Sequence, residues 1–327
     1  MGNYSSILMK RQYGFIALIL TILAVVLYLP KIDAMTAAVP ITTLPVPNAR
    51  LLGMGISYGT VLDDASMSDS NPAGLPYVRS AVQAGSRYFN NDLLLLGFTM
   101  VYNASNTDAF GVSMQRFSTS IDRVSLNGHA EGKMSIENVR LQAAYGKIIA
   151  DLARGEVSIG SSIAYVDLTH TKTRGSGVLC GIGGVYTYNA MKISVRYKDI
   201  PVFLTLNERA VHYFGILEYG ITYQWDINKS VSLLPVAGTQ YHGTAITFGG
   251  GVEMCYRDMI FARCGFSQPI PGFTQLSSGI GILYGILGSD FRCDYTLTAT
   301  GAFGFSHTIT VSIIALSSNS VFSGISK

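Results

Sequence analysis

From residue 81 to residue 316, apolar and polar residues alternate in segments of about ten residues, the length and period of transmembrane β-strands. A period of two places successive side chains on opposite faces of an extended strand. Turn-forming residues separate the segments. We mark fourteen of them, at residues 81–89, 93–103, 108–120, 134–149, 155–171, 176–189, 191–200, 212–226, 230–242, 244–257, 259–268, 277–287, 290–300 and 303–316.

Composition favours a membrane for these strands, although alternation alone also fits a soluble sandwich. Only 13% of the 327 residues are charged, against about 25% in a typical soluble domain. Tyr and Phe gather near segment ends, where the aromatic girdles of a membrane barrel lie. We therefore expect an all-β protein, a transmembrane antiparallel β-barrel of about 14 strands. The net charge of +3, without a Lys/Arg cluster, argues against a nucleic-acid partner.

The N-terminus predicts export. Lys10 and Arg11 precede the apolar run 15–29, and small residues including Ala34 follow it. This is the pattern of a cleavable signal peptide, which we place at residues 1–34. An uncleaved anchor is the alternative, but the run is shorter than the ~20 residues that a spanning helix needs. An exported barrel is expected in the outer membrane of a diderm bacterium, with outer-membrane lipids around it.

Residues 62–75, LDDASMSDSNPAGL, have neither a strand nor a helix period. They combine helix-capping residues with an Asn-Pro turn. A barrel of fourteen strands has an interior wide enough to need filling. We therefore expect an N-terminal hatch at 35–80, the barrel at 81–316 and a tail at 317–327; a solvated loop is the simpler alternative for 62–75. The candidate hatch motif is Asp63, Asp64, Asn71, Pro72, Ala73 and Gly74.

Charged residues recur on the polar faces of the predicted strands. Charges inside a membrane line a pathway or pair with one another. An excess of cations would suit an anionic head group such as a carboxylate, while a structural network that holds the hatch explains each residue equally well. The candidate lumen charges are Arg140, Lys192, Arg196, Glu218, Glu253, Arg263, Arg292 and Asp294.

The sequence gives little support for catalysis or metal binding. The cysteines lack zinc-site spacing, and strand phase puts Cys255 on the polar face and the other three on the apolar face, so we expect no disulfide. The glycine clusters at 181–184 and 249–251 lack Walker spacing. No pattern places a serine beside a histidine, as an esterase would need; the histidines are His129, His170, His212, His242 and His307. We predict a protein that is not an enzyme and holds no cofactor or metal.

Residues 48–78 also resemble a known pattern, that of the PorV/PorQ-like branch of the FadL outer-membrane protein superfamily. The branch opens with Ala-Arg-x-x-Gly-Met-Gly, followed by Asp-Asp-Ala-Ser and Asn-Pro-Ala-Gly-Leu. Here the matching stretches are Ala49-Arg50, Gly53-Met54-Gly55, Asp63-Asp64-Ala65-Ser66 and Asn71-Pro72-Ala73-Gly74-Leu75. The last segment, GFSHTITVSI, resembles the closing strand of the family through His307. The middle of the chain matches only by its alternation.

The resemblance implies a fourteen-stranded barrel with an N-terminal hatch. It also implies passive transport of a hydrophobic small-molecule ligand such as a long-chain fatty acid, which leaves through an opening in the wall. Some members of the branch instead serve protein secretion or surface attachment, so a secreted protein is the alternative partner. Two departures stand out: Ile56 replaces a family glycine, and the chain ends on Lys327 rather than on an aromatic residue.

Overall fold

A computed structural model describes residues 47–315, except 56–58, 90–92, 125–129, 153–154, 171–172, 208, 211–214, 271, 287 and 302–303. The predicted signal peptide, the first part of the predicted hatch, the C-terminal tail, Ile56, His129 and His212 lie outside the described residues. The described elements are α2 (Ala49–Gly53), α3 (Met67–Ser70), η2 (Pro72–Tyr77), β1 (Ala81–Phe89), β2 (Leu93–Asn103), β3 (Asp108–Val124), β4 (Ala130–Leu152), β5 (Gly155–His170), β6 (Thr173–Tyr188), β7 (Met191–Leu206), β8 (Arg209–Ala210), β9 (Ile216–Tyr223), β10 (Trp225–Asn228), β11 (Val231–His242), β12 (Ala245–Tyr256), β13 (Ile260–Ile270), β14 (Gln275–Ile286), β15 (Ser289–Ala299) and β16 (Phe305–Ala315).

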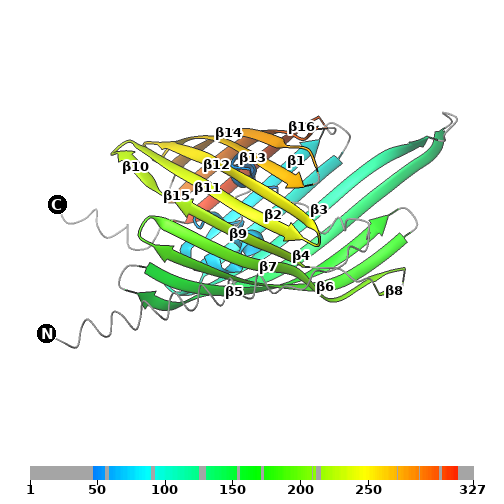
Figure 1. The fold of residues 1–327 in the computed structure, drawn as a ribbon, viewed down its shortest axis with the longest axis horizontal. Helices are drawn as coiled ribbons and strands as arrows, with labels where there is room; N and C mark the ends of the chain where they lie inside the picture. The colour runs from blue at the N-terminus through cyan, green and yellow to red at the C-terminus, as the bar shows by residue number, and fades with distance from the viewer. Residues whose placement is uncertain are drawn as a thin grey trace. The chain divides into compact units, whose positions relative to one another are not determined.

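The strands form one closed antiparallel barrel (Figure 1). Consecutive strands pair, and β16 closes the ring by pairing with β1 from Ala81–Ile314 to Phe89–Ser306. β8, β9 and β10 follow one another between β7 and β11, so the sixteen strands of the described residues occupy fourteen positions. The fourteen-stranded barrel predicted from the alternation is therefore confirmed. We call the end where β1 begins and β16 ends the inner end, and the opposite end the outer end.

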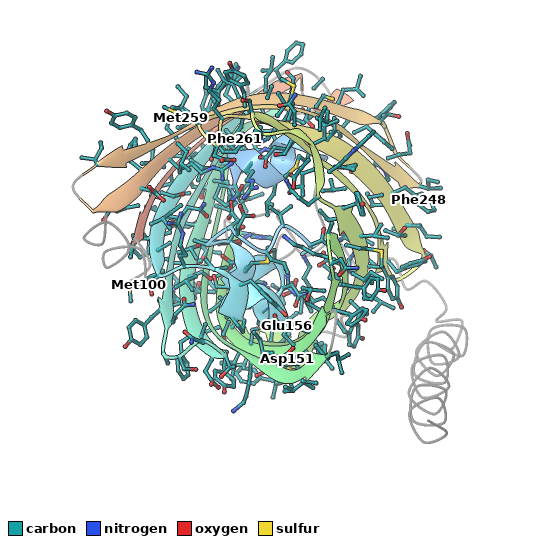
Figure 2. The ribbon with its side chains drawn as sticks, turned by 90° about the vertical axis from the view of Figure 1, so that its left-hand side faces the viewer. Met100, Asp151, Glu156, Phe248, Met259 and Phe261 are labelled. Carbon is teal, nitrogen blue, oxygen red and sulfur yellow. The ribbon has the colours of Figure 1, made fainter. Side chains whose placement is uncertain are left out.

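Side chains alternate between a lipid-facing outside and a polar inside. Along β15, Phe291, Cys293 and Tyr295 are exposed, whereas Arg292 and Asp294 are buried. Exposed apolar side chains recur on the outer face of the other long strands. Figure 2, which looks along the barrel, shows Met100 and Phe248 on the outer side. An apolar exterior and a polar interior are the signature of a transmembrane barrel. All four cysteines are free.

No helix in the described part of the chain is long and apolar enough to cross a membrane.

The hairpin of β3 and β4 is longer than the alternation predicted. The predicted segments 108–120 and 134–149 correspond to strands of 17 and 23 residues. Their pairing continues to Val124 and Ala130, past Asp122 and Lys133. Backbone hydrogen bonds between strands do not require an apolar face, so the strands continue where the alternation has stopped.

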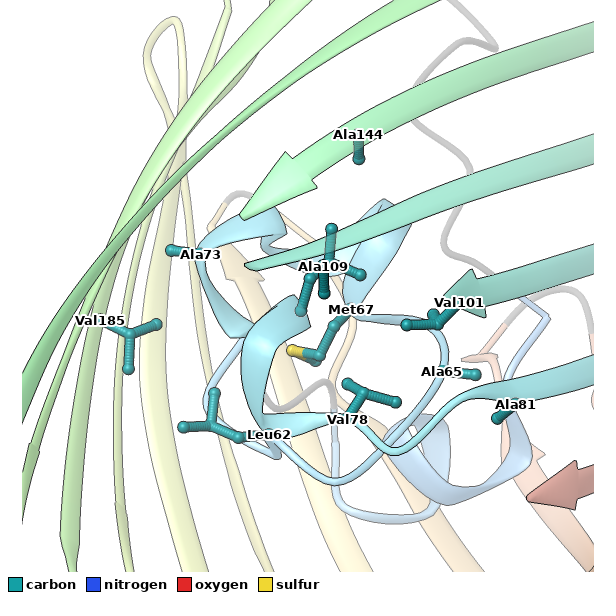
Figure 3. Close-up of a cluster of buried hydrophobic side chains, with 11 residues drawn as sticks. Leu62, Ala65, Met67, Ala73, Val78, Ala81, Val101, Ala109, Ala144 and Val185 are labelled. Carbon is teal, nitrogen blue, oxygen red and sulfur yellow. The ribbon is translucent and has the colours of Figure 1, made fainter. Parts of the chain in front are cut away.

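Residues 47–80, which we call the hatch, fill the inside of the barrel. Leu62, Met67, Ala73 and other apolar hatch residues pack against wall residues such as Val101 and Val185 (Figure 3). Burying this apolar surface stabilises the hatch by roughly 25 cal/mol per Å². The largest buried apolar cluster therefore joins the hatch to the wall.

Candidate functional site

The Asn-Pro element of the hatch is a capped turn seated on the wall. Asn71 is extended and its Oδ1 accepts from the Ala73 amide at 3.1 Å, capping η2, and Pro72 starts that helix. Two wall glycines allow the close approach. A Cβ on Gly160 would lie 2.3 Å from the Pro72 carbonyl carbon, and one on Gly183 would lie 2.1 Å from Asn71 Oδ1. Glycine at these two positions therefore leaves room for the turn to pack against the wall.

Asp64 joins two other hatch residues, Asn48 and Ser66, to the first strand. Its Oδ1 accepts from Asn48 Nδ2 at 2.8 Å and from the Ser66 amide at 2.9 Å. It also accepts from Gln83 Nε2 of β1 at 3.3 Å. Asn48 in turn caps α2, because its side chain accepts from the Leu51 amide at 2.9 Å. This predicted hatch residue is therefore a buried structural acceptor.

A buried ion network fixes α2 to the wall. Arg50 donates to both oxygens of Glu253, at 2.9 and 2.6 Å. Glu253 also accepts from Arg263 at 2.6 Å. Asp294 accepts from Arg292 at 2.9 Å and forms an ion pair with Arg263, whose Nη2 lies 2.8 Å from Asp294 Oδ1. The structure thus brings four of the predicted lumen charges together, and it adds Arg50. Arg50 escaped the strand analysis because the hatch has no alternating phase.

Asp63 extends this network toward solvent. Its Oδ1 accepts from Arg50 Nη1 at 2.8 Å, while 60% of its side chain is exposed. The exposed part lines a cavity of about 300 Å³ beneath the hatch at the inner end of the barrel. Lys192, another predicted lumen charge, and Ser232 line the same cavity.

A second group of charges contacts the other side of the hatch. Arg140 pairs with Asp199 at 2.6 Å, and Lys198 pairs with Glu218 at 2.7 Å. Arg196, which is 1% exposed, donates to the Ser70 carbonyl and lies 3.8 Å from Glu218. The predicted charges Arg140, Arg196 and Glu218 are thus largely neutralised where they lie.

The side chain of Asp199 faces the lumen, although the alternation of β7 predicts that it faces outward. A regular continuation of β7 would point it outward, like Tyr197. Two register shifts interrupt the pairing of β6 with β7 on either side of Pro201, and Asp199 takes the left-handed conformation with φ of 57°. The bulge turns its side chain inward, where it is 3% exposed. The sequence Asp-Ile-Pro at 199–201 could have indicated this bulge, because Asp favours turns and Pro within a sheet is confined to edge strands and bulges.

Asp69 is an acid that forms no ion pair with a cation among the described residues. It is 6% exposed, and its carboxylate accepts from the hydroxyls of Ser113 and Thr99 on the wall. Burial raises the pKa of Asp69, outweighing the opposing effects of the Ser113 hydrogen bond and of Arg140 and Arg196. Docking of this part of the hatch is therefore weaker when Asp69 is ionised.

The lumen wall also carries an apolar patch on β5, β6 and β7. Val166 and Leu179 are 1% exposed and Leu204 is 5% exposed. Ala164 and Leu168 complete the cluster. The register shifts around Pro201 lie beside it. Barrel interiors are normally polar, so five inward-facing apolar residues at one place need an explanation.

Solved structures share this architecture. A FadL homologue of Pseudomonas aeruginosa superposes with a TM-score of 0.55 at 11% identity, over 83% of this chain and 98% of the other. The toluene transporter TodX of Pseudomonas putida gives 0.53 at 11% identity, over 83% and 96%. The monoaromatic hydrocarbon channel CymD gives 0.52 at 12% identity, over 82% and 97%.

The chain has the fold of the FadL-type channels. No protein-family model matches the sequence, and no curated protein matches it. The likeness to the FadL-type channels at these identities concerns the fold alone, and the PorV/PorQ branch remains a resemblance of sequence motifs. His307, through which the last strand resembles that branch, lies on the outer face, where its Nδ1 is 2.8 Å from the Tyr295 hydroxyl.

Proposed function

We propose that this protein is a passive channel for hydrophobic compounds, such as long-chain fatty acids, in the outer membrane of a Gram-negative bacterium. The observation that carries the proposal is the inward-facing apolar patch formed by Ala164, Val166, Leu168, Leu179 and Leu204. An apolar compound that leaves water for this surface gains roughly 25 cal/mol per Å² of buried area. The FadL-type fold and the hatch support the same function.

The wall beside the patch offers a route to the membrane. Between β6 and β7 the ladder is interrupted by two register shifts, and Pro201 between them has no backbone N–H to donate. Val202 and Phe203 are 64% and 50% exposed on the outer side of the same stretch. A compound held by the patch therefore lies next to a stretch of the wall whose ladder is interrupted. No step of this function requires bond chemistry, so we propose no enzymatic activity.

A matched pair of substitutions tests the proposal. Val166→Asn places an amide in the patch, and Val112→Asn places the same group on the outer face of β3, away from the patch and from the interrupted ladder. Uptake of radiolabelled oleate should be measured in a Gram-negative host that lacks its own long-chain fatty acid channel. Val166→Asn should lower uptake by roughly tenfold, since an apolar side chain in contact contributes about 1.4 kcal/mol or more. Val112→Asn should transport like the unmutated protein, and both variants should remain heat-modifiable.

Unchanged uptake by a folded Val166→Asn variant would show that the patch is not on the route. If the unmutated protein also fails to raise uptake above the empty host, the channel function itself is wrong. The alternative from the sequence, a component of protein secretion or surface attachment, would then be favoured. Native mass spectrometry of the detergent-purified protein would show whether a polypeptide stays bound.

A further inference from the structure

His307 lies on a part of the outer wall whose other side chains are mainly apolar or aromatic. It is exposed on the outer face of β16, near the outer end of the strand. Among the described residues, the outward-facing side chains of β15, β16, β1 and β2 include no carboxylate, lysine or arginine. An ionisable group that faces a membrane is costly, and such groups commonly have a function. His307 therefore calls for a partner.

A tyrosine on the neighbouring strand holds the ring of His307. The Tyr295 hydroxyl lies 2.8 Å from His307 Nδ1, and the two ring centroids are 6.2 Å apart. When a phenol donates to one nitrogen of a neutral imidazole, the proton of the ring lies on the other nitrogen. Nε2 of His307 is therefore an N–H donor, and it has no hydrogen-bond partner among the described residues.

A second polar group lies beside His307, across the pair of strands that closes the barrel. Tyr88 on β1 is directly opposite His307 on β16. Opposite side chains on one face of an antiparallel pair have Cβ atoms about 5 Å apart. Tyr88 is 46% exposed on the outer face, and its hydroxyl forms no hydrogen bond with the described residues. An imidazole N–H and a phenol hydroxyl thus lie side by side on the outside of the wall.

Strand register places this pair at the level of lipid head groups. The row of outward-facing residues that are opposite one another from β15 to β4 is Leu297, His307, Tyr88, Leu94, Ser118 and Glu137. Because barrel strands tilt by about 35–45°, such a row climbs relative to the membrane. It ends at Glu137, whose ion pair with Arg116 is about half exposed, at 48% and 50%. His307 and Tyr88 therefore lie between the apolar band and the charged surface above it.

The surroundings of the pair fit a phosphorylated lipid. Phosphate oxygens accept strong, charge-assisted hydrogen bonds, and no carboxylate on the outward faces of these four strands repels an anion among the described residues. Toward the middle of the membrane, Ile309 and Ile313 on β16 are 48% and 56% exposed. A lipid whose phosphate contacts His307 and Tyr88 would thus lay its acyl chains along an apolar stretch of β16.

We infer that His307 and Tyr88 form a site on the outer wall for the phosphate group of an outer-leaflet lipid, and that Tyr295 positions the His307 ring. The site faces the membrane rather than the lumen, so it does not depend on the proposed channel function. It spans β16 and β1, whose pairing closes the ring. A lipid bound there stabilises the closed barrel, because it binds the folded form and not the unfolded chain.

Two forms of lipid A test the inference. Diphosphoryl lipid A and the same lipid A without its phosphates should be titrated into the protein in a non-ionic detergent, with bound lipid read by native mass spectrometry. The unmutated protein should bind the diphosphoryl form roughly tenfold more tightly, the effect of a hydrogen bond to a charged group. His307→Phe keeps an aromatic ring without its nitrogens. It should remove most of this preference and leave binding of the dephosphorylated form unchanged.

Smaller substitutions locate the site. Tyr88→Phe removes one hydroxyl and should reduce the preference roughly threefold, the effect of a neutral hydrogen bond. Tyr165→Phe makes the same change at a tyrosine of β5 that is 44% exposed on the outer face, and it should keep the preference. Tyr295→Phe leaves both donors in place but frees the His307 ring, so it should weaken the preference less than His307→Phe does.

A competition experiment separates lipid from free phosphate. Inorganic phosphate lacks acyl chains and should not displace diphosphoryl lipid A at comparable concentration. Displacement would show that the site takes free phosphate instead. Equal binding of the two forms of lipid A, or binding of neither, refutes the phosphate site. An unchanged preference in folded His307→Phe, or in Tyr88→Phe should the first variant lose heat-modifiability, refutes its location. An unchanged preference in Tyr295→Phe refutes the positioning role of that tyrosine.

Discussion

At the scale of residues, the direction of each side chain decides what surrounds it. Ile280 near the middle of β14 is 62% exposed on the outer face, whereas Ser232 on β11 lines the cavity beneath the hatch. The first position faces lipid and the second faces a space that admits water. The same charged substitution should therefore destabilise the barrel at Ile280 and be tolerated at Ser232.

We predict that Ile280→Arg destabilises the folded barrel by about 2–4 kcal/mol, the cost of a cation near the bilayer midplane. Ser232→Arg should change the free energy of unfolding little. Denaturant unfolding in lipid vesicles, followed by heat-modifiability, measures both. Equal losses in the two variants would contradict the lipid-facing assignment of the outer surface.

Asp69 predicts a pH dependence of hatch docking. Because burial raises its pKa in the docked state, the ionised carboxylate weakens docking, and the penalty is full above that raised pKa. The penalty is lost as pH falls through the raised pKa toward the unfolded value of about 3.9. Hydrogen exchange of residues 66–77, corrected for intrinsic rates, should therefore slow from pH 7.5 to mildly acidic pH. Asp69→Asn should flatten this dependence; an unchanged slope would assign it to another group.

At the scale of elements, the hatch is held by shape as well as by charge. The turn at Asn71 and Pro72 approaches the wall backbone so closely that only glycine fits at Gly160 and Gly183. Gly184, directly opposite Ile159 on the neighbouring strand, is different, since a Cβ there would meet Val195 at an ordinary 3.7 Å. Gly160 and Gly184 are therefore a matched pair of positions for testing how the hatch packs against the wall.

Gly160→Ala should loosen the hatch without opening the barrel. The added Cβ would collide with the Pro72 backbone, which cannot move aside as a flexible side chain could. We expect raised single-channel conductance in planar bilayers and faster hydrogen exchange of residues 66–77, with unchanged heat-modifiability. Gly184→Ala should behave like the unmutated protein. If Gly160→Ala has the conductance and the hydrogen-exchange rates of the unmutated protein, packing of the turn does not require glycine at this position.

At the scale of the whole molecule, the wall and the hatch are separable. The ring of strands closes through β1 and β16 without using hatch residues. The hatch contributes Arg50 and Asp63 to the ion network, whereas Glu253, Arg263 and Arg292 lie on the wall, so Glu253 keeps its bonds to Arg263 and Arg292 without the hatch. The barrel can therefore keep its form when the hatch is removed.

Deletion of residues 47–78 should leave a heat-modifiable barrel that conducts ions more strongly than the full chain. The reason is that the hatch fills the lumen, while the ladder of the wall has no free edge. Planar-bilayer recordings and gel mobility before and after heating measure the two properties. Loss of the heat-modifiable form would show that the hatch is needed for closure, and unchanged conductance would show that it does not plug the barrel.

The sequence by itself determined the closed barrel of fourteen strands and the lipid-facing side of the strands that alternate without interruption. Both follow from local information, because a period of two fixes the face of each side chain and a bilayer tolerates strands only in a closed ring. Residues such as Phe291 and Arg292 could therefore be assigned to opposite faces from their neighbours in the chain alone.

Only the tertiary structure shows which of the predicted lumen charges pair with one another. Arg50 meets Glu253 across 203 positions of sequence, and Asp199 turns inward only because two register shifts displace β7. Such pairings depend on which strands are neighbours and in what register, and the period of the sequence carries no information about either.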